Sequence, residues 1–120
     1  KEKNIYNFYY NNGTKKINYS FIEWIKKIQK LNPGEILLQS IDRDGSLKGY
    51  DLEIIKKIKN YFECPLIVCG GAGNWKHFVE AFKLGSIDAV CTNNIYHLTY
   101  KSILSSKKYC IKNNIQIRLE

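Results

Sequence analysis

The sequence predicts an α/β fold built on a parallel sheet, and two observations support this prediction. From residue 35 onward, a short apolar run is followed by a segment with helical spacing, and this unit occurs three times, over residues 35–62, 65–84 and 88–112. The apolar runs do not alternate with polar residues, so both faces of each strand are expected to be covered. Strands that each lead into a helix and return to one sheet give parallel pairing with right-handed crossovers.

Residues 5–19 precede these units and are predicted to form a small β-hairpin. Asn12-Gly13 lies between two stretches rich in Tyr, Phe and Ile. This dipeptide is a strong hairpin signal, because a type I′ turn needs a positive φ at both central positions. A helix is expected to follow, with Ser20 as its cap and Glu23 completing a capping box.

The three strand–helix units follow in chain order. Asp51 and Asn74 are expected to cap the first two of their helices, and the last helix should run from about Tyr100 to Lys112. Three strands cannot close a barrel, which needs eight strands and about 250 residues. We therefore expect open sheet edges, with residues missing upstream of the first residue or pairing with another copy. The strands are expected at the apolar runs 36–38, 66–69 and 88–91.

Composition argues against several classes of function. The net charge is +8, but nearly all the positive charge is Lys dispersed over helix faces, which favours solvated surfaces over nucleic-acid binding. No stretch reaches the roughly 18 apolar residues of a membrane span. The four cysteines include no CxxC pair and no zinc spacing, so no metal or cofactor is predicted. Cys69 and Cys91 are expected to be small core residues rather than ligands or disulfides, which suits a reducing cytoplasm.

A glycine-rich run, residues 70–73 (Gly-Gly-Ala-Gly), directly follows the second apolar strand. Adjacent glycines let the backbone approach an anion and point N–H groups at it. The run is neither a dinucleotide fingerprint nor a Walker loop, and it can also be read as a simple tight turn. Asn93-Asn94 after the next strand would begin a short helix, and paired loops of this kind form phosphate sites in barrels.

The loop after the first strand reads Asp42-Arg43-Asp44-Gly45. Carboxylates at a strand end are in the right place for substrate contact or acid–base work, although Asp42 and Arg43 can equally pair to hold the loop. Glu35 stands at the N-terminal end of the first strand. On spacing alone, it is interpreted as an ordinary charged residue at the start of a strand. His77 and His97 lack partners at ligand spacing and are expected to be structural or exposed.

Eight short stretches together form a specific pattern, namely residues 34–38, 40–45, 49–51, 70–73, 77–78, 80–82, 95–97 and 117–118. Taken together, these stretches resemble the cyclase subunit of imidazole glycerol phosphate synthase. The similarity covers essentially the whole chain and includes the hairpin and Trp24, and it matches the second half of that family's barrel. The resemblance implies one partial domain, residues 1–120, that forms the C-terminal half of a (β/α)8 TIM barrel with an inserted β-hairpin near the N-terminus.

The resemblance also implies a chemistry. A partner glutaminase supplies ammonia, with which the cyclase converts a phosphorylated formimino ribotide into imidazole glycerol phosphate and an aminoimidazole carboxamide ribotide. The general acid and base are two aspartates that lie upstream of this chain. Asp44 matches an aspartate that contributes to turnover, and Glu35 matches a member of the charged ring that gates ammonia entry. The matching residues of one substrate phosphate site are Gly45, Gly70, Gly71, Asn93 and Asn94.

Some residues depart from the family pattern. Gln39 and Cys69 stand where Thr and Ser are usual, and Asn93-Asn94 replaces a small pair in a phosphate loop. Two other interpretations therefore stay open. One is a paralogous subunit that feeds ammonia to a sugar amidotransferase in the biosynthesis of surface polysaccharides or nonulosonic acids. The other is a non-catalytic half-barrel.

Overall fold

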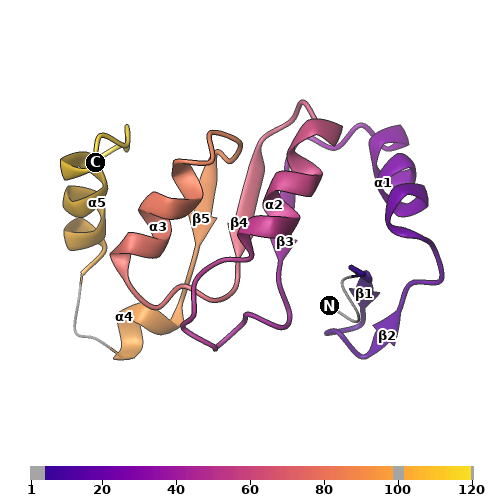
Figure 1. The fold of residues 1–120 in the computed structure, drawn as a ribbon, viewed down its shortest axis with the longest axis horizontal. Coiled ribbons are helices and arrows are strands. Elements are labelled where there is room, and N and C mark those ends of the chain that lie inside the picture. Colours follow the sequence, from indigo (N-terminus) through magenta and orange to yellow (C-terminus); the bar gives the residue numbers. More distant parts are fainter. Residues whose placement is uncertain (1–4, 99–101, 120) are drawn as a thin grey trace.

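The computed structural model describes residues 5–98 and 102–119 and consists of a parallel three-stranded sheet with helices, preceded by a short antiparallel strand pair (Figure 1). The sheet has the order β3-β4-β5, with Leu38 in register with Val68 and Val68 with Val90. The predicted α/β class with a parallel sheet is therefore confirmed. The elements are β1 (Tyr9–Tyr10), β2 (Lys15–Lys16), α1 (Phe21–Lys30), β3 (Ile36–Gln39), α2 (Leu52–Ile58), the 3-10 turn η1 (Lys59–Tyr61), β4 (Leu66–Cys69), α3 (Trp75–Phe82), β5 (Ala89–Cys91), α4 (Asn94–Leu98) and α5 (Ile103–Lys112).

The helix caps follow from local sequence. The Ser20 hydroxyl accepts from the Glu23 N–H, and the Glu23 carboxylate accepts from the Ser20 N–H at 2.8 Å, which is the predicted capping box. These hydrogen bonds to Ser20 lower the pKa of Glu23. Asp51 and Asn74 cap α2 and α3 as predicted. The last helix begins at Ile103 with Ser102 as its cap, and the predicted start at Tyr100 lies outside the described residues.

The N-terminal pair differs from the predicted two-residue turn. Tyr10 pairs with Lys15, so the loop between the strands has four residues rather than two. Asn11, Asn12 and Gly13 all have positive φ, at 53°, 54° and 79°. Asn and Gly tolerate this left-handed region better than most residues. The three consecutive residues can therefore all adopt it, and they form a loop wider than a two-residue turn.

One face of the sheet packs against α2 and α3 and forms the core. Val68 is 2% exposed, and Ile55 of α2 and Phe78 of α3 are 1% and 3% exposed. Cys110 brings α5 into the same cluster, since its side chain is fully buried. Burial also raises the pKa of the Cys110 thiol.

The other face of the sheet is not covered as predicted. None of its side chains is buried, and Leu37 is 59% exposed. Cys69 and Cys91 lie on this face, so the prediction that they are small core residues is wrong. Helices follow the strands on one side only, and no described element fills the other side. The face consists of Leu37, Gln39, Ile67, Cys69, Ala89 and Cys91.

The loops that follow the three strands gather at one end of the sheet, together with α4 (Figure 1). Because the strands are parallel, their carboxyl ends all reach this end. Among the described residues, no helix is long and apolar enough to cross a membrane.

Candidate functional site

A cavity of about 250 Å³ lies at the carboxyl ends of β3, β4 and β5. Loops from three separate strand–helix units form its wall, so the sheet topology assembles it from segments far apart in sequence. All of the residues predicted for turnover or phosphate binding line this cavity, namely Asp44, Gly45, Gly70, Gly71, Asn93 and Asn94.

The backbone of this cavity offers hydrogen-bond donors. Within the described chain, the N–H groups of Gly45, Gly71 and Ala72 donate to no other group. Gly71 and Ala72 are buried in the chain, and a buried N–H without a partner is costly. An anion bound in the cavity would relieve this cost, because loop N–H groups of this kind hold phosphate oxygens.

The loop after β3 contacts the glycine loop after β4 and holds it in place. The Gly49 N–H donates to the Gly71 carbonyl at 2.7 Å. Gly71 has a φ of 104°, and a Cβ at this position would collide with the Gly49 carbonyl oxygen. The glycine therefore serves this close packing between two loops, whatever the cavity binds. A substitution at Gly71 tests folding as well as anion binding.

His77 also holds this loop. Its Nδ1 accepts from the Gly73 N–H at 3.0 Å, and its ring lies against Gly49. The structural role predicted for His77 agrees with these contacts. Its position four residues after the glycine run, on the first turn of α3, is the sequence signal for this contact, although the contact itself was not predicted.

Two side-chain pairs orient the polar groups at the cavity. Nε2 of Gln39 donates to Oδ2 of Asp44 at 3.1 Å, which links the last residue of β3 to the predicted catalytic carboxylate. Nε2 of His97 lies 2.9 Å from Oδ1 of Asn93. In the tautomer with a proton on Nε2, His97 occupies the amide oxygen of Asn93 and leaves its NH₂ group as a donor. Sequence reasoning missed both pairs.

Tyr50 connects the cavity wall to the core. Its ring is 4% exposed, and its hydroxyl donates to the Cys91 carbonyl at 3.2 Å. Burial raises the pKa of Tyr50, so the phenol remains a neutral donor over the physiological range. The start of α2 is thereby held against the end of β5.

Glu35 lies at the opposite end of the sheet. It directly precedes β3 and is exposed. The structure therefore separates Glu35 from the cavity at the carboxyl ends, as the sequence order predicted.

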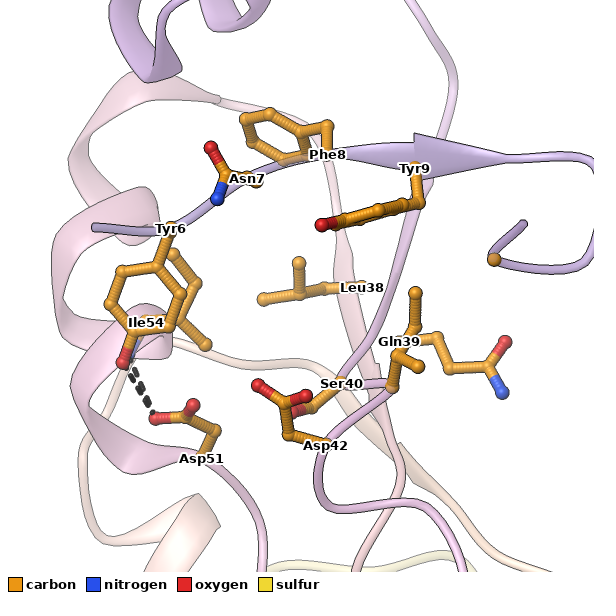
Figure 2. Close-up of a pocket in the computed structure, with 12 residues that line it drawn as sticks. Tyr6, Asn7, Phe8, Tyr9, Leu38, Gln39, Ser40, Asp42, Asp51 and Ile54 are labelled. Atoms are coloured by element: carbon orange, nitrogen blue, oxygen red, sulfur yellow. Dashed lines mark hydrogen bonds between the residues drawn. The ribbon is translucent and has the colours of Figure 1, made fainter. Parts of the chain in front are cut away.

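A second cavity, of about 430 Å³, lies between the N-terminal segment and β3 (Figure 2). The Tyr6 hydroxyl donates to Oδ1 of Asp51 at 3.0 Å. Burial raises the pKa of Tyr6, and the hydrogen bond to Asp51 raises it further. Since Asp51 also caps α2, this contact anchors the N-terminal segment to the helix that follows β3. The sequence did not predict this cavity.

Comparison with known proteins identifies the family. The family model described as "Histidine biosynthesis protein" matches residues 1–101. The chain belongs to this family. Members of the histidine biosynthesis family are TIM barrels, and the α/β structure with its parallel sheet agrees with that class.

Individual members of the family are similar over most of this chain. The imidazole glycerol phosphate synthase subunit HisF of Hydrogenobaculum sp. (strain Y04AAS1) is 39% identical over 118 residues, which are 98% of this chain and 47% of the relative. HisF of Chlorobaculum tepidum is 43% identical over 107 residues, 89% of this chain and 43% of the relative. HisF of Saccharolobus solfataricus is 42% identical over 107 residues. The chain thus spans about half the length of the curated relatives it matches.

Proposed function

We propose that this chain is part of a cytoplasmic, ammonia-dependent cyclase of histidine biosynthesis, a lyase of the imidazole glycerol phosphate synthase type. Its likeness to HisF subunits of three organisms supports the pathway. The observation that carries the site assignment is the convergence on one cavity of three loops, two of which have N–H groups that donate to no other group within the described chain.

Each cavity residue has a proposed part in this function. The N–H groups of Gly45 and Gly71 bind one phosphate of the ribotide substrate, and the positive net charge of +8 favours an anionic ligand. Gly70 gives the loop its turn, with a φ of 97°. The amide groups of Asn93 and Asn94 complete the phosphate site.

Asp44 is proposed to contact the reacting part of the substrate. The Gln39 amide holds one carboxylate oxygen, which fixes the orientation of the group and leaves the other oxygen for substrate. The principal acid and base are proposed to be aspartates on strands that this chain does not contain. On this proposal, the chain alone does not catalyse the reaction.

A glutaminase partner is proposed to supply ammonia at the end of the sheet where Glu35 lies. Glu35→Gln in the complete protein, assayed with the glutaminase, should lower glutamine-dependent turnover more than turnover with an ammonium salt. Equal losses in the two assays would remove the gating role.

The direct test of the proposed reaction uses the complete protein, the formimino ribotide and an ammonium salt. Formation of imidazole glycerol phosphate is the expected result. The departures at Gln39, Cys69 and Asn93-Asn94 favour, as a second candidate, a paralogue that channels ammonia to a sugar amidotransferase. Failure to cyclise the ribotide, in a folded protein that still activates its glutaminase, would exclude the cyclase and favour the second candidate.

A further inference from the structure

Two cysteines face each other across the strands that lead into the cavity. Cys69 and Cys91 are register partners at the ends of β4 and β5. Register partners on parallel strands point to the same face, here the uncovered one. Both side chains line the cavity, and both thiols are free.

The backbone geometry brings this pair within bonding range. Neighbouring strands lie about 4.8 Å apart, and the Cα atoms of a disulfide are usually about 4.4–6.8 Å apart. The other two cysteines lie elsewhere, with Cys64 before the start of β4 and Cys110 buried in α5.

We propose that Cys69 and Cys91 form a dithiol modification site, which a small dialkyl disulfide oxidises to an intramolecular disulfide between the ends of β4 and β5. The more exposed thiol, Cys91, attacks first as its thiolate and expels one alkanethiolate. Cys69 then attacks the mixed disulfide and expels the second. Two protein thiols are oxidised, the reagent is reduced to two alkanethiols, and these carry away both protons.

The environment of Cys69 determines why it reacts second and how fast the disulfide closes. Burial, together with the neighbouring Cys91 thiol, raises the pKa of Cys69 to about 11. At neutral pH, Cys69 is therefore a thiol, and the thiolate is the attacking species. The closing step should accelerate as the pH rises toward this value.

The disulfide would affect the cavity through the loop that directly follows each cysteine. Gly70 and Thr92 are the next residues, and both line the cavity. A disulfide would tie the starting points of these two loops together. The proposal itself needs neither phosphate binding nor the cyclase reaction, so it can fail while the proposed function stands.

The experiment uses the complete protein with Cys64→Ser, because Cys64 and Cys69 otherwise share the tryptic peptide 60–76. The reduced protein is incubated with bis(2-hydroxyethyl) disulfide at pH 7 and pH 9, and its peptides are measured by mass spectrometry. We expect peptides 60–76 and 84–101 to be joined with the loss of two hydrogen atoms, faster at pH 9.

Two matched variants isolate the second cysteine. Adding Cys69→Ser should stop the reaction at a mercaptoethanol adduct on Cys91, whereas adding Cys110→Ser should leave the cross-link unchanged. A persistent adduct on Cys91 while Cys69 is intact would overturn the proposal, as would two free thiols after exposure to the reagent or a cross-link that needs Cys110.

Discussion

The two faces of the parallel sheet come from the same three strands but differ in how they meet water. Toward α2 and α3, Val68 is 2% exposed and packs in the core. On the opposite face, its neighbour in sequence, Ile67, is only partly buried, and Leu37 is 59% exposed. Apart from Gln39 at the end of β3, the open face nevertheless carries apolar residues and cysteines, as the covered face is apolar. Apolar residues on an uncovered face indicate that the complete fold covers them. We therefore propose that the open face is the interior of a barrel whose other strands lie outside this chain.

The largest effect is expected on the covered face. Phe78→Ala removes a ring that is 3% exposed and packs against Trp75 at 5.4 Å between ring centroids. The free energy of unfolding of the complete protein should fall by about 3–5 kcal/mol, because the lost contacts leave a cavity. Denaturant titration measures this change. Lys56→Ala on the exposed side of α2 is the control, and a comparable loss in both variants would contradict the packing described.

The next largest effect on the free energy of unfolding is expected on the open face, where a buried and an exposed position predict clearly different values. If this face lines a barrel, Leu37→Ala should destabilise the complete protein by about 2 kcal/mol or more, as for a buried leucine. A change within about 0.5 kcal/mol, typical of a surface site, would mean that Leu37 stays exposed in the complete protein. The same denaturant titration decides between the two values.

A third prediction concerns the glycine loop that leads from the end of β4 into α3. Gly71→Ala should cost about 2 kcal/mol, since alanine is strained at a φ of 104° and its Cβ meets the Gly49 carbonyl. Gly34→Ala is the matched control, because nothing lies within 4 Å of a Cβ there and its φ is not in the left-handed region. Thermal unfolding of both variants tests this, and equal stabilities would rule out the close approach.

The sequence predicted the parts of this fold that depend on near neighbours. Ser20, Asp51 and Asn74 cap their helices because each bonds a residue three positions on. The short helix that begins at Asn94 was also expected. The width of the N-terminal loop was not, because the pairing of Tyr10 with Lys15 sets it rather than the Asn-Gly signal.

The site was predicted at the level of its loops and not of its contacts. Parallel strands bring their carboxyl ends together whatever the side chains are. Because the motifs directly follow the strands in sequence, their order was enough to predict where the cavity lies. The contact between Gly49 and His77 joins residues 28 positions apart in the chain, and no local pattern encodes it. The exposure of Cys69 and Cys91 could not be read from apolar strands, because it depends on what packs on the open face.

The smallest effect in this series is on ligand affinity. Asn94→Ala should weaken the binding of inorganic phosphate by about tenfold, within the range of one hydrogen bond to a charged group. Calorimetry on the complete protein measures the dissociation constant. Asn60→Ala, an exposed change outside the cavity lining, should leave it unaltered. Undiminished affinity in Asn94→Ala would exclude this side chain from the site.

The most direct test of the phosphate site follows the backbone N–H groups themselves. In ¹⁵N-labelled complete protein titrated with inorganic phosphate, the amide resonances of Gly45, Gly71 and Ala72 should show the largest shifts, because these groups donate to nothing else in the described chain. The amide of Gly73, which already donates to His77, should move less. Saturable phosphate binding that leaves the three amides unshifted would contradict the central claim that this cavity holds the phosphate.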